Sequence, residues 1–300
     1  MNIGKKIKEL RSEKLMTQSE LAGGEITRNM LSRIENGAAL PSLGTIVYLA
    51  QKLGVPAGYL LSEGDEEFLY HKTSVMKNIR KAYADKRFEI CRDICLSEFE
   101  EFDDELELIL TDCCLGVADE SIRNGRLHKA CDFLDEALMH AQETMYDTTT
   151  QKNSISIMFG LLKYISPALD SNEADTTIGD EMFHPGFFAN VLCKYITVFL
   201  NAENYNSFID ELDSINDLTE IDKLFALHLQ ARGLMNEGDF SNALAVLHKV
   251  IDSETIPPRL LLYLSCADME ICCRETDNYK GAYEFSQNKL EILEHMLAEI

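Results

Sequence analysis

Apolar residues recur at three- and four-residue spacings along almost the whole chain, as they do on one face of a helix. Alternation of apolar and polar residues, which is typical of a half-buried strand, is scarce. Prolines stand only where a helix is expected to begin or end, at Pro41, Pro56, Pro167, Pro185, Pro257 and Pro258. The pattern therefore predicts an all-α fold.

Residues 1–61 predict five short helices. The apolar face of the first helix is expected to consist of Ile3, Ile7, Leu10 and Leu15. A capping box of Thr17 and Glu20 begins the second helix, and a glycine pair ends it. Thr27 caps a third helix over residues 28–35, which an Asn-Gly pair closes. The fourth and fifth helices are expected to begin at Pro41-Ser42 and at Pro56.

The remainder of the chain contains a repeated pattern. Each repeat has a turn, then an aromatic residue or leucine that we term the anchor, then a small residue three positions later. The anchors are Phe88, Leu127, Tyr205, Phe240 and Tyr279. The small residue is Cys91, Ala130, Ala243 or Ala282 in four repeats, and Phe208 replaces it in the Tyr205 repeat. A small side chain is needed because the two helices of a repeat cross closely there.

The anchors are spaced by 39, 78, 35 and 39 residues, and 78 is twice 39. A degenerate sixth repeat is therefore expected around residues 155–169. This period and pattern are typical of tetratricopeptide repeats, so we predict an α-solenoid of about five to six helix pairs. The polar, turn-rich segment 170–186 is expected to be a loop.

The net charge of −23 divides unevenly along the chain. Residues 1–64 carry eight basic and six acidic residues, a balance of +2, whereas residues 65–300 carry −25. A domain boundary is expected at residue 64, where the charge changes abruptly, so that 1–64 is a small N-terminal domain and 65–300 the repeat domain. Nucleic-acid binding remains compatible with so acidic a chain, because only the docking face needs to be basic.

Other functional classes find little support in the sequence. The nine cysteines form no CxxC pair, so reduced buried thiols are favoured over disulfides, a redox role or a zinc site. No apolar run approaches the ~20 residues of a membrane helix, and the N-terminus lacks a signal peptide, so we expect a cytoplasmic protein. The seven histidines lie outside any known catalytic motif, so neither an enzyme nor a metal or cofactor is expected.

The segment MTQSELAGGEITRNMLSRIENGAALPSLGTIVYLAQKLGVP, residues 16–56, resembles the helix-turn-helix family of phage repressors and Cro. The family's elements TQxEL, SRIENG, PS and LAxxLGVP are all present. The resemblance implies a transcriptional regulator whose third helix enters the major groove. It makes Arg28 and Asn29 the candidates for base contacts, because Arg pairs with guanine and Asn with adenine. The implied phosphate contacts are Lys6, Gln18, Thr27, Ser32, Arg33 and Asn36.

Four residues separate Ala22 from Thr27, one fewer than in most phage repressors. Together with repeats in a chain near 300 residues, this short turn resembles the peptide-sensing regulators of Gram-positive bacteria, of the Rgg/PlcR/PrgX type. That resemblance implies a homodimer, an inverted-repeat operator in double-stranded DNA, and a short signalling peptide in the concave groove of the repeats.

Asn and Arg side chains pair well with peptide backbone amides, so such residues at inward-facing positions of first helices are the candidate peptide contacts. Counting back from the anchors places them at Arg123, Asn190, Asn201, His228, Arg232, Asn236 and Arg274. The alternative is that the repeat domain binds a folded protein partner, which requires an exposed apolar patch rather than a polar groove.

Overall fold

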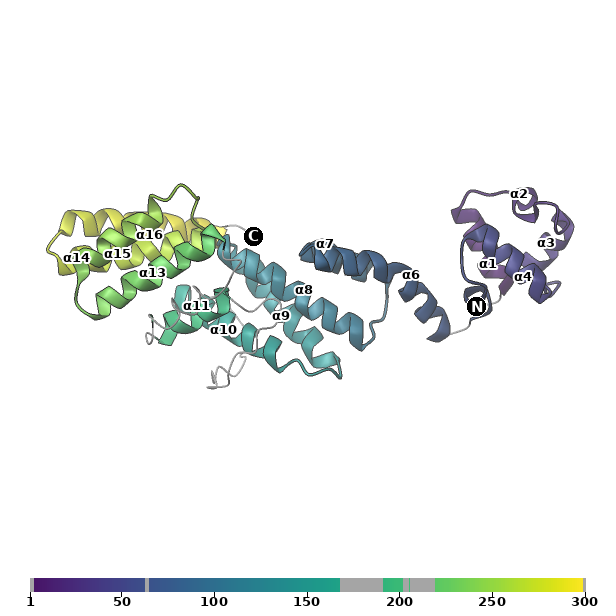
Figure 1. Ribbon diagram of the computed structural model, residues 1–300, viewed down its shortest axis with the longest axis horizontal. Helices are drawn as coiled ribbons and strands as arrows, with labels where there is room; N and C mark the ends of the chain where they lie inside the picture. The colour runs from purple at the N-terminus through teal and green to yellow at the C-terminus, as the bar shows by residue number, and fades with distance from the viewer. Residues whose placement is uncertain (1–2, 63–64, 168–190, 202–204, 206–218, 299–300) are drawn as a thin grey trace. The chain divides into compact units, whose positions relative to one another are not determined.

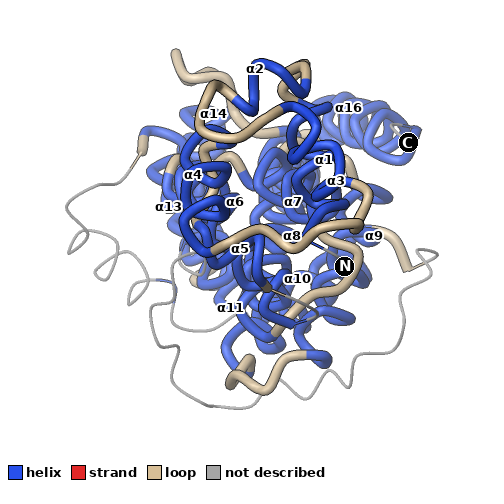
Figure 2. Tube along the Cα trace, turned by 90° about the vertical axis from the view of Figure 1, so that its right-hand side faces the viewer, coloured by secondary structure: helices blue, strands red, loops and turns tan. Residues whose placement is uncertain are grey.

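The computed structural model describes residues 3–62, 65–167, 191–201, 205 and 219–298, and the statements below concern these residues. The described chain is helical and contains no strand (Figure 2). The all-α prediction is therefore confirmed. None of the described helices is both long enough and apolar enough to cross a membrane. The chain divides into two compact units, residues 1–80 and 81–300, which are described separately.

The first unit begins with five short helices, as the sequence predicts. This part of the chain is drawn in purple in Figure 1. They are α1 (Ile3–Glu13), α2 (Gln18–Ala22), α3 (Arg28–Glu35), α4 (Leu43–Leu53) and α5 (Ala57–Leu61). A longer helix, α6 (Asp65–Ala84), begins just after the predicted domain boundary and extends past the end of the unit at Arg80. The core of the five helices is formed by apolar side chains that include Ile7, Leu21, Leu31, Ile34, Leu49 and Leu53.

One predicted core residue of this unit is wrong. Leu15 was expected on the apolar face of the first helix, but α1 ends at Glu13 and Leu15 is 91% exposed. Its backbone takes a left-handed conformation, with φ of 55°. The helical spacing that placed Leu15 beside Ile7 and Leu10 therefore no longer applies at this position.

The second unit contains the helices of the repeats. They are α7 (Phe88–Glu98), α8 (Asp104–Arg123), α9 (Leu127–Glu143), α10 (Thr149–Ile165), α11 (Val191–Asn201), α13 (Glu220–Asn236), α14 (Phe240–Ile251), α15 (Arg259–Glu275) and α16 (Tyr279–Ala298). Four of the five predicted anchors are the first residue of a helix: α7, α9, α14 and α16. The small residues three positions on from these anchors are all buried: Cys91, Ala130, Ala243 and Ala282.

The turn before each of these four anchors has one conformation. The residue two positions before the anchor has a positive φ in every case: Lys86, Gly125, Gly238 and Asp277, at 56°, 76°, 80° and 59°. The amide of the next residue then donates to a carbonyl five positions back. These bonds run from Arg87 to Ala82, Arg126 to Ser121, Asp239 to Leu234 and Asn278 to Cys273, at 2.8–2.9 Å. Each first helix therefore ends in the same left-handed cap.

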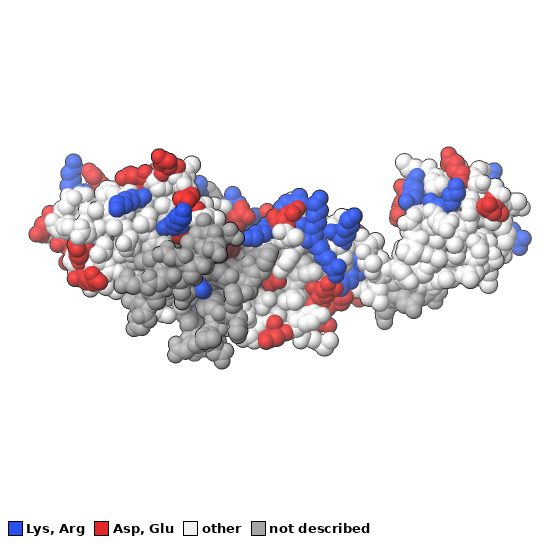
Figure 3. Space-filling model, in the orientation of Figure 1, with Lys and Arg blue, Asp and Glu red and all other residues white. Residues whose placement is uncertain are grey.

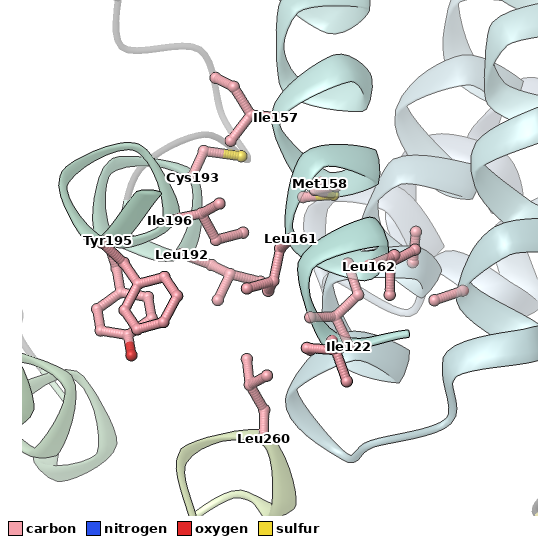
Figure 4. Packing of buried hydrophobic residues seen from close by; sticks show 14 of the residues in the cluster. Ile122, Ile157, Met158, Leu161, Leu162, Leu192, Cys193, Tyr195, Ile196 and Leu260 are labelled. Carbon is pink, nitrogen blue, oxygen red and sulfur yellow. The ribbon is translucent and has the colours of Figure 1, made fainter. Parts of the chain in front are cut away.

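One hydrophobic core runs through the second unit from α8 to α16. Figure 4 shows part of it, where side chains of α8, α10, α11 and α15 converge. Tyr195 of α11 is among the largest fully buried side chains of the described chain. α10 occupies most of the range expected for the degenerate sixth repeat. The predicted loop 170–186, and all of the Tyr205 repeat except its anchor, lie outside the described residues.

Candidate functional sites

The two helices of the predicted helix-turn-helix motif are both capped by threonine. The Thr17 hydroxyl accepts from the Glu20 amide, and the Glu20 carboxylate accepts from the Thr17 amide at 2.7 Å, so the predicted capping box is confirmed. The hydrogen bonds that the Glu20 carboxylate accepts from the Thr17 amide and hydroxyl lower the pKa of Glu20 below its ordinary value. Thr27 accepts from the Met30 amide at 3.1 Å and begins α3 at Arg28, where the sequence predicts. The caps set the direction of both helices.

The face of α3 that turns inward is apolar, and the opposite face is polar. Leu31 and Ile34 are buried in the core of the unit. The polar residues Thr27, Arg28, Asn29, Arg33 and Asn36 are exposed, and Ser32 is half-buried. Six of the eight predicted DNA contacts therefore form one accessible polar surface along α3 and its two ends. Whether each contacts a base or a phosphate stays a prediction.

A buried carboxylate joins α3 to α1 and α2. The Glu35 side chain, 1% exposed, accepts from Arg11 Nε and Nη2 at 2.6 and 3.1 Å, and from Gln18 Nε2 at 2.8 Å. Arg11 also donates to the Met16 carbonyl at 2.8 Å. The hydrogen bond with Glu35 raises the pKa of Arg11. Glu35 therefore orients the Gln18 amide and leaves that side chain one N–H for an outside acceptor such as phosphate.

Lys6 is not where the sequence prediction placed it. It was expected to contact phosphate, but it is 1% exposed, so that prediction is wrong. Its ammonium donates to the carbonyls of Tyr59 and Ser62 at 3.1 and 2.7 Å, and it lies 4.9 Å from the centre of the Tyr59 ring. A cation at the end of a helix stabilises the last carbonyls, and Lys6 does this for α5.

The predicted peptide contacts lie in the second unit, and three of them belong to connected polar groups. His228 of α13 is fully buried, with Nδ1 3.0 Å from the Tyr195 hydroxyl and Nε2 3.2 Å from Asp268 of α15. His228 therefore cannot line an open groove, and its prediction as a peptide contact is wrong. In the structure the His228 side chain points into the core between α11, α13 and α15.

The two arginines of this region lie at the edge of the core. Arg232, one helical turn after His228, donates to Asp268 at 3.4 Å, and its guanidinium lies 4.3 Å from the centre of the Phe199 ring. Burial lowers the pKa of Arg232, but the Asp268 charge together with Tyr205 and Tyr164 raises it above the ordinary value. The Arg232 side chain is 20% exposed, so part of its guanidinium remains accessible.

Arg123 has a similar environment at the end of α8. It donates to Asp119 at 2.6 Å and to Asp222 at 3.5 Å, and it lies 5.4 Å from the centre of the Phe225 ring. Its side chain is 23% exposed. Burial lowers the pKa of Arg123, but the two carboxylates outweigh burial and raise it. Arg123 thereby links α8 to α13, the helix that also carries Arg232.

Four predicted peptide contacts remain. Asn201, Asn236 and Arg274 are exposed near the ends of α11, α13 and α15, and Arg274 pairs with Glu270 of its own helix. Asn190 lies outside the described residues. Sequence analysis missed Tyr195 and Asp268, which hold His228 and Arg232 in place. Asp268 could have been found, because a carboxylate within an apolar helical pattern requires a cationic partner.

On the face shown in Figure 3, basic and acidic side chains are interspersed in both units. All nine cysteines are free thiols and buried, as the sequence analysis favours. Six of the eight basic residues of the first 64 are exposed, whereas Lys6 and Arg11 are engaged inside the unit.

Comparison with known proteins identifies one part of the chain. Residues 4–66 match the family described as helix-turn-helix domain. No curated protein matches the chain. Among solved structures, Bacillus thuringiensis PlcR in complex with the peptide PapR7 and DNA is 18% identical over 100% of this chain and 99% of that chain, with a TM-score of 0.25.

Two further solved structures are similar at this level. ComR from S. thermophilus, in complex with DNA and its signalling peptide ComS, is 17% identical over 99% of this chain and 94% of that chain, with a TM-score of 0.22. The PrgX/iCF10 complex is 14% identical over the same shares, with a TM-score of 0.21. Such TM-scores are too low for the superpositions to support an argument. Residues 4–66, with α2 and α3 at their centre, are a helix-turn-helix domain.

Proposed function

We propose that the protein is a sequence-specific, DNA-binding transcriptional regulator controlled by a short signalling peptide that its repeat domain binds. The proposal that the protein binds DNA is supported mainly by the helix-turn-helix domain. Its helix α3 presents Arg28, Asn29 and Arg33 on one exposed face. A helix in the major groove needs this arrangement, with polar side chains outward and apolar side chains holding the helix from behind.

The peptide-binding part rests on chemistry in the second unit. Arg123 and Arg232 each carry five N–H donors on a partly exposed guanidinium that aspartates hold in position. Donors fixed in this way suit the carbonyls of an extended peptide. The sequence resembles the peptide-sensing regulators of the Rgg/PlcR/PrgX type, and that resemblance implies a peptide ligand. A helix-turn-helix regulator acts where the DNA is, so we place the protein in the cytoplasm.

Regulation follows if the peptide binds one arrangement of a homodimer more tightly than the other. We propose that the repeat domain supplies most of the dimer interface and that the domain boundary lies near residue 64. The dimer would then place two copies of α3 on the half-sites of an inverted repeat.

The test begins with DNA. Purified full-length protein is incubated with fragments of its own genome, and the bound fragments are sequenced. We expect one enriched inverted repeat, and an Arg28→Ala/Asn29→Ala double variant should lose the enrichment while keeping its helical circular dichroism. Lys249→Ala, which removes an exposed cation from α14, is the charge control. Recovery of the same fragments by the double variant would refute the assignment of α3.

The peptide is tested separately, with synthetic short peptides encoded beside the gene. We expect one of them to bind the purified protein and to change its affinity for the enriched operator, and Arg232→Ala should weaken that binding more than Lys249→Ala does. Operator affinity that is unchanged by every such peptide would refute peptide control. If a folded protein bound the repeat domain and no peptide did, the alternative hypothesis of a protein partner would be favoured.

A further inference from the structure

A second polar cluster lies in the repeat unit, distinct from the one formed by His228, Arg232 and Asp268. It contains Cys114 of α8 together with Glu136 and His140 of α9. The Cys114 sulfur, a Glu136 carboxylate oxygen and a ring nitrogen of His140 all lie within 4.8 Å of one another. Cys114 and His140 are buried, whereas the Glu136 side chain is 22% exposed. Sulfur, imidazole nitrogen and carboxylate oxygen are all ligands of zinc.

The separation of the two ligand atoms on α9 suits one metal ion. Tetrahedral zinc, with bonds of about 2.0–2.3 Å, brings its ligand atoms to roughly 3.3–3.8 Å from one another. His140 Nε2 lies 3.7 Å from Glu136 Oε1, which is within that range. Glu136 and His140 are four residues apart, so they project from the same face of α9 toward α8.

The second ring nitrogen of His140 is the observation that indicates a ligand. His140 Nδ1 lies 2.6 Å from Glu107 Oε2 of α8, so that nitrogen is engaged. Nε2 is buried and makes no hydrogen bond in the described part of the chain, since the nearby Glu136 Oε1 lies 3.7 Å away. A buried imidazole nitrogen without a hydrogen bond is costly, and a metal ion at this position would remove that cost.

Both ligating groups on α9 also have the outer partners that metal ligands require. Glu107 holds the His140 ring through Nδ1, which leaves Nε2 for the metal, as in carboxylate–histidine–zinc arrangements. Arg92 of α7 holds Glu136, with Nε 2.7 Å from Oε1 and Nη2 2.9 Å from Oε2. These outer contacts fix the ligand side chains before any ion arrives.

The formal charges of the cluster are compatible with a dication. A divalent ion bound to a Cys114 thiolate, Glu136 and a neutral His140 ring, with Arg92 and Glu107 beside it, gives a sum of zero, and binding would release the protons that the thiol and the ring carry without the metal.

We propose that Cys114, Glu136 and His140 bind one zinc ion between α8 and α9, with water completing the tetrahedron and with Glu107 and Arg92 as positioning residues. The ion would join two helices of the same repeat, so binding stabilises the second unit. The site has no CxxC signature in the sequence, because its single cysteine lies on α8 and its other ligands lie on α9.

The test uses full-length protein freed of metal by a chelator. Zinc binding is measured by competition with a chromophoric chelator, and cobalt(II) serves as a spectroscopic substitute. We expect one ion per chain, a thiolate-to-cobalt charge-transfer band in the near ultraviolet, and a higher unfolding temperature with zinc. Absence of stoichiometric binding by the wild-type protein would overturn the proposal.

Substitutions of the proposed ligands test where the zinc ion binds. Cys114→Ser should abolish the charge-transfer band, and His140→Gln should abolish zinc binding. Glu107→Gln, which alters only an outer partner, should weaken binding about ten- to a hundredfold. Cys131→Ser, which changes another buried thiol on α9, is the matched control and should bind as the wild type does.

Helical circular dichroism identifies any variant that fails to fold. If Cys114→Ser does so, Glu107→Gln and the more exposed Glu136→Gln still test the site. Wild-type affinity in these two variants, or a charge-transfer band that persists without Cys114 and disappears in Cys91→Ser, would overturn the assignment.

Discussion

Lys6 and Glu35 are charged residues whose side chains are buried inside the N-terminal unit. Each is held by partners far away in the sequence: Lys6 by Tyr59 and Ser62, and Glu35 by Arg11 and Gln18. A charged side chain in a polar position of a helix is normally solvated, so the sequence alone favours the surface for both. Their burial depends on which helices meet, and this could not be derived from helical spacing.

The first prediction concerns the Glu35 carboxylate. Glu35→Ala should destabilise the N-terminal unit by about 3 kcal/mol, because it leaves the Arg11 guanidinium partly buried without its partner. Glu9→Ala, which removes an exposed carboxylate from α1, is the control and should change stability by less than about 0.5 kcal/mol. Hydrogen exchange of α1–α3 in the full chain measures the difference. Equal protection in the two variants would contradict the role of Glu35.

The second prediction concerns Asp268. Asp268→Ala should destabilise the repeat unit by about 2–3 kcal/mol, because Arg232 is then left without its carboxylate at the edge of the core. Replacing Arg232 by leucine in the same variant should recover part of that stability, since the unpaired charge is then removed. Urea unfolding of the single and double variants gives the coupling energy, and a coupling of zero would contradict the pairing.

At the scale of helices and turns, the sequence predicts much of the structure. Four anchors begin helices and four small residues are buried at the crossings, because both features follow from local turn chemistry and helical period. The inward-facing register of the first helices was less predictable. His228 proved to be core, since an error of one residue turns a side chain by about 100° around the helix.

The third prediction separates backbone strain from packing in these turns. Gly238→Ala should cost about 1 kcal/mol, because a Cβ at this positive φ is strained although no described residue other than its two chain neighbours has an atom within 4 Å of it. Gly125→Ala should cost about 1–3 kcal/mol more, because its Cβ would lie 2.7 Å from Met296 Cγ and 3.1 Å from Arg259 Cβ. Urea unfolding of both variants tests this order, and equal destabilisation would show that packing at Gly125 adds nothing.

At the scale of the whole molecule, charge is divided between a nearly balanced N-terminal segment and a strongly acidic remainder. The acidic repeats should repel DNA, so the contacts are expected to come from α3 and its surroundings. The charge division and the helix-turn-helix domain could both be predicted from the sequence. The zinc ligands could not, because only the packing of α8 on α9 brings them together.

The fourth prediction concerns how DNA binding depends on salt. Arg33→Ala should weaken binding to all sequences alike and reduce the slope of log affinity against log salt concentration by about 0.9 for each phosphate that Arg33 neutralises. Arg28→Ala should instead change the preferred base, at a cost of about 1–3 kcal/mol. Titrations at several salt concentrations separate the two effects. Identical slopes for wild type and Arg33→Ala would exclude Arg33 as a phosphate contact.

The two sides of α3 have a consequence for how such a regulator acquires new targets. Leu31, Ile34 and Glu35 fasten the helix from behind, whereas Arg28 and Asn29 take no part in that attachment. The outward residues can therefore be exchanged without unfolding the domain. Gene duplication followed by substitutions at these two positions would give a daughter regulator with another operator, while the sensing half of the chain stays unaltered.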